Sequence, residues 1–274
     1  MTFGERLSAV FADRGQLCVG IDPHDSLLVE WGLAGATGAR DFGLRVVEAA
    51  AGRVGIVKPQ VAFYERFGAA GISALEEVLA AARAAGLLVI ADAKRGDIGS
   101  TMAGYTAAWT GEGPLAADAL TVSPYLGSAS LAETNTTARA AGAGLFLLAA
   151  TSNPEAAELQ TARTASGATV AATIVERVRE WNTGESLGST GVVIGATVDL
   201  DALGLDRESL VGVPILAPGF GAQGARYADV RDLFGPATGG VLLSASRSIL
   251  AAGPVDIASA IATQAAEVAE AVAA

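Results

Sequence analysis

Several residue types on which common functions depend are almost absent from this chain. Its 274 residues include one cysteine and one histidine. One cysteine cannot form an internal disulfide, and one histidine beside one thiol offers no cluster suited to zinc or iron. The cysteine, Cys18, lies inside an apolar run, where we expect a buried structural thiol and not a nucleophile. This composition fits a cytoplasmic setting.

Positive charge is also scarce. The chain carries 18 basic and 29 acidic residues, which gives a formal net charge of -11. Nucleic acids and anionic membrane surfaces require a basic face, so we expect neither as a partner. No apolar run approaches the length of a membrane-spanning helix. Residues 1–14 predict an amphipathic helix and not a signal peptide, because their apolar side chains recur at helical spacing.

Apolar residues, by contrast, are abundant and regularly placed. With 51% hydrophobic and 17% charged residues, the chain can bury a large core as a single domain over residues 1–274. Short apolar runs, each followed by loop residues and a helix-like segment, occur eight times: Leu17–Ile21, Val54–Val57, Leu87–Ala91, Ala119–Val122, Leu145–Ala149, Gly191–Ile194, Val213–Ala217 and Gly240–Leu243.

Eight strands alternating with helices predict a TIM (β/α)8 barrel in the α/β class. A doubly wound open sheet is the alternative. It is disfavoured because the segment after the first run is Gly20-Ile21-Asp22-Pro23-His24 and carries no G-x-G-x-x-G. Residues 151–190 hold more than one helix and elaborate the barrel, and Val255–Val272 is expected to close the ring of helices.

The two lysines stand out among the basic residues. All the others are arginine, and Lys58 and Lys94 each follow an apolar run. An ammonium is a compact charge that can give up a proton, which guanidinium cannot, so we expect both lysines to act in a site. Asp92 and Lys94 are two residues apart at the end of a predicted strand and therefore project to the same side.

Active groups of a barrel belong at the carboxyl ends of its strands, and the residues at these positions are too polar for packing. The set is Asp22, Lys58, Asp92 with Lys94, Ser123, Thr151–Asn153, Thr197, Pro218–Gly224 and Ser246-Arg247. Two loops fit a phosphate group. Residues 217–224 contain three glycines that permit close backbone approach, and residues 244–248 offer backbone N–H groups and a guanidinium where barrels often bind phosphate. We expect His24 to be a structural or loop histidine.

Several motifs together resemble one family. They are Asp92-Ala93-Lys94-Arg95-Gly96-Asp97-Ile98 with Thr101, Gly20–His24, Gly219–Gly224 and Ser246-Arg247. In combination they resemble orotidine 5′-phosphate decarboxylase over nearly the whole chain. The chain length and the segments 123–127 and 151–154 look like the longer bacterial subgroup of that family.

This resemblance implies decarboxylation of orotidine 5′-phosphate to uridine 5′-phosphate in pyrimidine biosynthesis, without a metal or an organic cofactor. It also implies a homodimer with two composite active sites. Lys94 would be the proton donor, Asp92 would face the substrate's carboxylate, and Lys58 would position Asp92 and the ribose. The remaining implied contacts are Asp22 with a ribose hydroxyl, Asp97, Ile98 and Thr101 with the partner's site, Ser152 and Gln223 with the pyrimidine, and Arg247 with Gln223 on the phosphate.

The implied chemistry makes physical sense of these residues. Loss of CO2 from C6 of the pyrimidine leaves a carbanion without a conjugated electron sink, so a barrel without a cofactor must stabilise it electrostatically. A fixed ammonium does so best in a site closed to water.

Two other functions stay open at this point. A metal-dependent sugar-phosphate decarboxylase or aldolase of the same superfamily shares D-x-K-x-x-D, but resemblance to it would call for an acidic ligand where Lys58 stands. A non-catalytic phosphosugar-binding barrel is the other alternative, and retention of both lysines counts against it.

Overall fold

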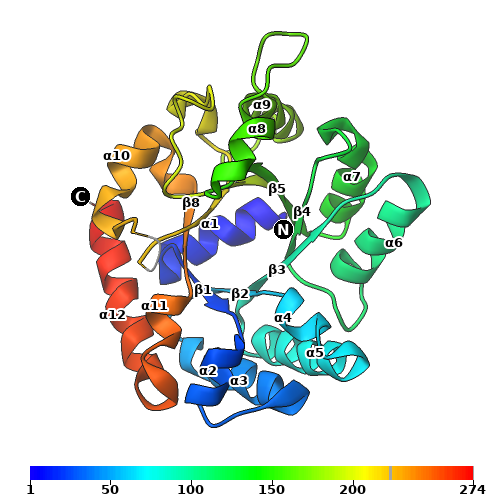
Figure 1. The fold of residues 1–274 in the computed structure, drawn as a ribbon. Coiled ribbons are helices and arrows are strands. Elements are labelled where there is room, and N and C mark those ends of the chain that lie inside the picture. Colours follow the sequence, from blue (N-terminus) through cyan, green and yellow to red (C-terminus); the bar gives the residue numbers. More distant parts are fainter. Residues whose placement is uncertain (222–223, 274) are drawn as a thin grey trace.

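The computed structural model describes residues 1–221 and 224–273. Eight parallel strands form a closed barrel in which each strand pairs with the next in chain order and β8 pairs with β1 (Figure 1). The strands are β1 (Leu17–Ile21), β2 (Ile56–Pro59), β3 (Leu88–Arg95), β4 (Ala119–Val122), β5 (Gly144–Ala150), β6 (Thr190–Ile194), β7 (Ile215–Pro218) and β8 (Val241–Ala245). The predicted TIM barrel is confirmed, and the open-sheet alternative is wrong.

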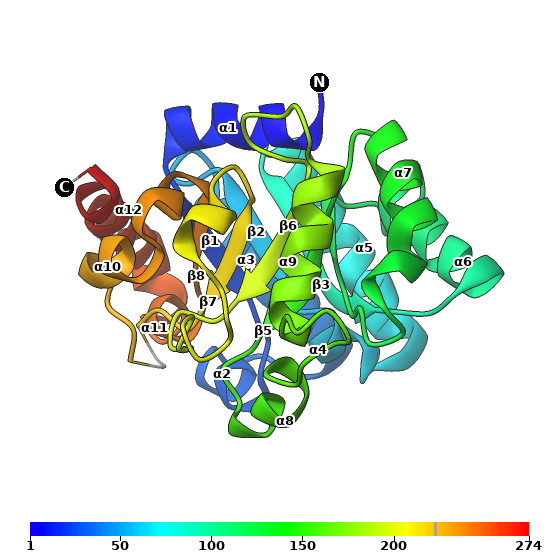
Figure 2. The ribbon, with the colours of Figure 1, turned by 90° about the horizontal axis from the view of Figure 1, so that it is seen from above.

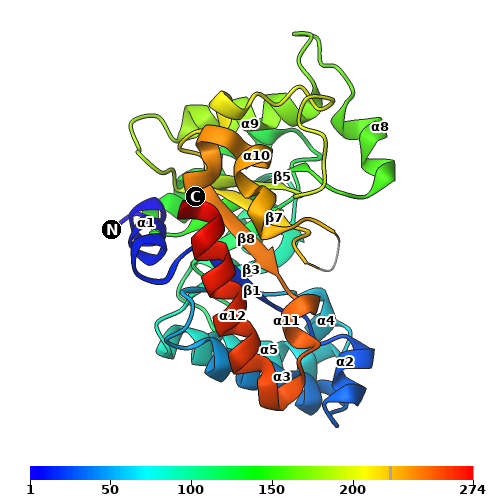
Figure 3. The same ribbon diagram turned by 90° about the vertical axis from the view of Figure 1, so that its left-hand side faces the viewer.

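Helices surround the barrel. The α-helices are α1 (Phe3–Arg14), α2 (Asp25–Glu30), α3 (Gly35–Ala50), α4 (Ala62–Glu65), α5 (Gly68–Ala84), α6 (Gly99–Thr110), α7 (Ala132–Ala140), α8 (Ala157–Gln160), α9 (Val170–Trp181), α10 (Val230–Phe234), α11 (Arg247–Leu250) and α12 (Gly253–Ala273). Short 3-10 helices are η1 (Ser128–Leu131), η2 (Pro154–Ala156), η3 (Arg207–Leu210), η4 (Tyr227–Asp229) and η5 (Gly235–Gly240). In Figure 3, α12 runs down the outside of β8 and β1 beside α3, and so closes the ring as expected.

Two departures from the expected elements have physical causes. The polar residues of β2 and β3 lie inside strands: β2 runs through Lys58, and β3 continues through Lys94 to Arg95. Hydropathy ends a strand at its first charge, although a barrel strand can carry charges at its mouth. After β6, the carboxylate of Asp199 accepts from the N–H groups of Asp201 and Ala202 and fixes a turn, and the short helix η3 follows in place of the expected α-helix.

The amino end of the barrel is closed by α1 (Figure 2). A capping box between Thr2 and Glu5 starts this helix, as expected for a threonine followed by a glutamate three positions later. Phe3 and Leu7 are buried, and the ring of Phe3 meets that of Phe146 edge-on with centroids 6.0 Å apart. The predicted amphipathic helix therefore covers the bottom of the barrel.

The barrel interior changes character along its axis. Inward side chains alternate with outward ones, so each strand contributes every second residue to the interior. Near the amino end these residues, together with Phe3 and Leu7, form one apolar cluster: Cys18, Ile56, Leu88, Ile90, Ala119, Phe146, Val193, Leu216 and Leu242. Two residues further along β2 and β3 stand Lys58 and Asp92, both almost fully buried. No helix within the described ranges is long and apolar enough to cross a membrane.

Candidate active site

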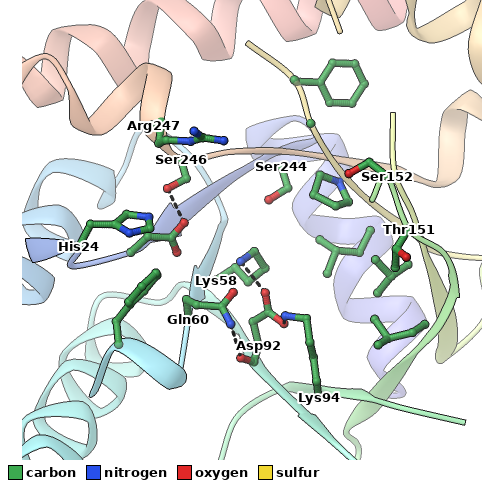
Figure 4. Close-up of a pocket in the computed structure, with 18 residues that line it drawn as sticks. His24, Lys58, Gln60, Asp92, Lys94, Thr151, Ser152, Ser244, Ser246 and Arg247 are labelled. Carbon is green, nitrogen blue, oxygen red and sulfur yellow. Dashed lines mark hydrogen bonds and ion pairs between the residues drawn. The ribbon is translucent and has the colours of Figure 1, made fainter. Parts of the chain in front are cut away.

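A cavity of about 490 Å³ opens at the carboxyl ends of the strands (Figure 4). Its walls come from seven of the eight strands, all but β4, or from the loops that follow them. The lining residues are Asp22, His24, Lys58, Gln60, Phe63, Asp92, Lys94, Leu148, Thr151, Ser152, Val193, Leu216, Pro218, Gly219, Phe220, Ser244, Ser246 and Arg247. The structure therefore places most of the predicted site residues in one chamber, at the barrel end where enzymes of this fold act.

One carboxylate joins the two lysines at the floor of this cavity. Lys58 Nζ lies 2.9 Å from Asp92 Oδ2, and Lys94 Nζ lies 2.5 Å from Asp92 Oδ1. The side chains of Lys58 and Asp92 are 7% and 10% exposed, whereas that of Lys94 is 45% exposed. Lys58 is therefore a buried charge at the cavity floor, and Lys94 presents its ammonium to the cavity.

The titration behaviour of the buried groups follows from this pairing. Burial alone would raise the pKa of Asp92, but the charges of Lys58 and Lys94 outweigh it and hold that pKa far below its usual range. Burial alone would lower the pKa of Lys58, but Asp92 and Asp22 outweigh it and raise that pKa. Both groups are therefore ionised at neutral pH. Cys18 is buried as expected, and burial raises the pKa of its thiol to about 12.

The end of β1 is held against the end of β8. Ser246 Oγ donates a hydrogen bond of 2.6 Å to Asp22 Oδ2. A Cβ on Gly20 would lie 2.7 Å from Ser246 Cβ, so glycine at this position lets the two strand ends approach. Asp22 Oδ1 is buried and has no hydrogen-bond partner among the described residues, which leaves an acceptor available to a hydroxyl donor.

The loop after β5 is braced by the elaboration that follows it. Gln160 Oε1 accepts from the backbone N–H of Thr151, and Gln160 Nε2 donates to Thr151 Oγ1, both at 2.9 Å. Gln160 is the last residue of α8, so the short helix fixes the segment that brings Thr151 and Ser152 to the cavity. This contact gives the 151–190 segment a role that could not be predicted from sequence.

The two loops predicted to bind phosphate meet at the cavity rim. Gly219 and Phe220 follow β7, and Arg247 begins α11 after β8. The guanidinium of Arg247 has no hydrogen-bond or ion-pair partner among the described residues. Gly221 has φ +73°, a conformation that favours glycine. Gln223, predicted to contact the pyrimidine and the phosphate, lies outside the described residues.

Three predicted residues do not line the cavity of their own chain. Asp97, Ile98 and Thr101 follow the end of β3, where Ile98 is 58% exposed and Asp97 Oδ1 accepts from the N–H of Ile98 at 2.8 Å. Within one chain, Asp97 therefore does not join Lys58, Asp92 and Lys94 at the cavity floor.

Several residues that were not predicted as site residues also line the cavity, among them Gln60, His24 and Phe63. Gln60 Nε2 donates to the backbone oxygen of Asp92 at 3.2 Å. His24, expected to be a structural or loop histidine, packs against Phe63 with ring centroids 4.1 Å apart and ring planes 58° apart, and both residues line the cavity. Gln60 could have been predicted, because it lies two residues after Lys58 and therefore projects to the same side of the strand. The contact of His24 with Phe63 joins segments far apart in the chain, and nothing in the sequence predicts it.

Residues 1–221 and 224–273 contain no group of three or more His, Cys, Asp or Glu side chains arranged to hold a metal ion.

Comparison with known proteins identifies the family. The Orotidine 5′-phosphate decarboxylase / HUMPS family profile matches residues 15–261. The chain belongs to this family. The orotidine 5′-phosphate decarboxylase of Nocardioides sp. is 54% identical over 254 residues, which cover 90% of this chain and 91% of that protein. The decarboxylase of Salinispora arenicola is 51% identical over 256 residues, with 92% and 91% coverage.

Solved structures of the decarboxylase family agree. A crystal structure from Streptomyces avermitilis, described as a candidate orotidine 5′-phosphate decarboxylase, has a TM-score of 0.95 at 50% identity and covers 100% of this chain and 96% of its own. The OMP decarboxylase of Leishmania donovani has a TM-score of 0.80 at 32% identity, with both chains covered completely. The resemblance inferred from the motifs is therefore confirmed at the level of the family.

Proposed function

We propose that this protein converts orotidine 5′-phosphate to uridine 5′-phosphate and CO2, in pyrimidine biosynthesis and without a cofactor. One observation carries the proposal: a carboxylate held between two ammonium groups at the floor of a barrel-mouth cavity, in a chain of the decarboxylase family. We also propose that residues 1–274 form one domain and that the enzyme is cytoplasmic.

The reaction needs a positively charged group beside the carbon that loses CO2, because that carbon becomes negatively charged. When the C6–carboxyl bond breaks, its electron pair stays on C6, and CO2 leaves as a neutral molecule. The ammonium of Lys94, directed into the cavity by Asp92, stabilises that pair and then transfers a proton to C6. Because Lys58 and Lys94 already hold the Asp92 carboxylate, little reorganisation is needed as the charge develops.

The substrate's remaining groups match the cavity rim. Asp22, with its buried acceptor oxygen, binds a ribose hydroxyl, and Lys58 contributes from the floor. Ser152 lies on the braced β5 loop and addresses the pyrimidine together with Gln223. Arg247 begins α11 and lines the cavity. Its guanidinium binds the phosphate, together with Gln223.

We further propose that the active unit is a homodimer in which each site is completed by the other chain. Asp97, Ile98 and Thr101 follow the catalytic strand yet do not line their own cavity. Ile98 is exposed, as are Tyr125 and Leu126 in the loop after β4. Large exposed apolar side chains at the mouth are typical of an interface, and a two-fold axis beside it would bring these residues to the partner's substrate.

The direct test of function is an ultraviolet assay. The purified protein is incubated with orotidine 5′-phosphate, and the spectral change to uridine 5′-phosphate is followed, with Lys94→Ala as the matched control. Turnover that survives exhaustive chelation supports the proposal. Tight nucleotide binding without turnover would favour the non-catalytic barrel, and loss of turnover on chelation would favour the metal-dependent alternative.

The composite site is tested by mixing two inactive variants, Lys94→Ala and Asp97→Ala. In a hybrid dimer, one site collects both lesions and the other collects none. Random reassortment makes about half of the dimers hybrid, so roughly a quarter of all sites should regain wild-type composition. Hybrids are isolated through a tag on one chain. If isolated hybrids are no more active than their parents, Asp97 does not serve the neighbouring site.

A further inference from the structure

The backbone of Lys94 is unusual. Its φ is +49°, and within residues 1–221 and 224–273 it is the sole non-glycine residue with positive φ. This left-handed conformation is unfavourable for a side chain with a Cβ, so surrounding contacts must hold it. The residue held in this way is the one that carries the proton in the proposed reaction.

An irregularity in the sheet accompanies this backbone. Strands β3 and β4 pair at Ala91 with Leu120 and next at Arg95 with Val122. Three residues of β3 therefore stand opposite the single residue Thr121 of β4. Bulges of this kind occur next to active sites, where they redirect side chains, and they remove backbone partners from the ladder.

The side chain of Thr121 bonds to groups of β3 at this irregularity. Its Oγ1 accepts a hydrogen bond of 2.9 Å from the backbone N–H of Lys94 and lies 3.0 Å from Asp92 Oδ1, to which it donates. One hydroxyl has one proton and can also accept, so it serves both partners at once. Thr121 is 0% exposed, so its hydroxyl meets these two partners away from solvent.

We propose that Thr121 is a positioning residue for the decarboxylation, an inference that rests on the proposed function. Its hydroxyl fixes the left-handed turn at Lys94 and the rotation of the Asp92 carboxylate. The ammonium of Lys94 and the hydroxyl of Thr121 meet on the same oxygen, Asp92 Oδ1, while Lys58 occupies Oδ2. Thr121 itself does not line the cavity and acts through these two residues.

The test compares two substitutions that differ in the hydroxyl. Thr121→Val keeps the branched shape and removes the hydroxyl, whereas Thr121→Ser keeps the hydroxyl. We expect kcat of Thr121→Val to fall at least about tenfold, the size typical of losing a hydrogen bond to a charged group. We expect Thr121→Ser to remain within about threefold of wild type by the same reasoning, and the affinity of both variants for uridine 5′-phosphate to change less than kcat.

A matched control separates positioning from stability. Thr190 is also 0% exposed and lies on a strand, but at the amino end of the barrel, where its hydroxyl bonds to Asn135. Thr190→Val should lower the melting temperature without changing kcat. The inference is overturned if Thr121→Val keeps kcat within about twofold of wild type, or if nucleotide affinity falls as much as kcat. It is equally overturned if the valine and serine variants lose the same activity.

Two further measurements keep the test decisive. Thr121→Ala is the second hydroxyl-free variant. If neither it nor Thr121→Val folds, the hydroxyl serves folding and the inference fails. A crystal structure of the valine or alanine variant should show Lys94 leaving the positive-φ region, and an unchanged backbone there would refute the positioning role. Wild-type protein without turnover would instead refute the proposed function, and the Lys94 backbone would still decide the inference.

Discussion

The two ends of this barrel are built from the same eight strands and have opposite properties. At the amino end, α1 lies across the opening, and the inward side chains form an apolar cluster with Phe3 and Leu7. At the carboxyl end, the next inward positions on β2, β3 and β8 are Lys58, Asp92 and Ser244, and these polar side chains line an open cavity. One step of two residues, from Ile90 to Asp92, crosses the boundary. Stability and chemistry are therefore assigned to different layers of one structure.

Lys94→Ala is the strongest test of this difference between the two ends of the barrel. We expect kcat to fall on the order of 100-fold or more, because a preorganised donor to the developing charge is removed. The melting temperature should stay close to that of wild type, because the Lys94 side chain is half exposed at the barrel mouth. Steady-state kinetics and calorimetry measure the two quantities. A variant that keeps more than about a tenth of wild-type kcat would remove Lys94 from its assigned role.

The cavity rim is tested by Arg247→Ala. We expect kcat/KM for orotidine 5′-phosphate to fall about 10- to 150-fold, which corresponds to losing one charge-assisted hydrogen bond. For orotidine, which lacks the phosphate, the same substitution should change kcat/KM little, because its partner is absent. Parallel kinetics on the two substrates give the comparison. Equal losses on both would place Arg247 away from the phosphate.

The buried charges at the carboxyl end of the barrel should also make the stability of the protein depend on pH. The pKa of Asp92 is lower in the folded than in the unfolded chain, so the stability it contributes is complete above the unfolded pKa of about 4 and is lost as the pH falls toward the folded pKa. Below pH 4, the unfolding free energy of wild type should fall more steeply than that of Asp92→Asn, by up to about 1.4 kcal/mol per pH unit. Denaturant titrations without substrate measure both, and parallel curves would contradict the assignment.

The smallest expected effect comes from the apolar layer, two residues below Asp92 on the same strand. Ile90→Val removes one buried methyl group and should lower the unfolding free energy by about 0.5–1.5 kcal/mol. Its kcat should remain within about twofold of wild type, because the substitution alters packing and no charge. A large loss of kcat at unchanged stability would show that the two layers are coupled.

How well the sequence predicts the structure also differs between the apolar and the charged parts of the barrel. Buried parallel strands are apolar on both faces, so all eight appeared as short apolar runs. Their ends were missed where a strand carries charge, as β2 does at Lys58 and β3 at Asp92. Hydropathy treats such residues as loop, although the barrel pairs them with each other.

The site was predictable only as far as motifs record it. Lys58, Asp92 and Lys94 were identified by residue type and spacing, and the structure brings them together. The contacts of Thr121, and of His24 with Phe63, depend on pairing between distant segments, which spacing along the chain does not contain. The predicted roles of Asp97, Ile98 and Thr101 depend on a second chain, so no single-chain geometry tests them.

The unequal exposure of the two lysines has a consequence for repeated turnover. Each cycle of the proposed reaction leaves a proton on the product and a neutral amine on the enzyme, so a proton must be supplied before the next substrate binds. The side chain of Lys58 is almost fully buried, whereas that of Lys94 is about half exposed. Lys94, which gives up the proton, can therefore be protonated again by bulk solvent once the product has left. Lys58, which is buried, keeps its charge throughout the cycle.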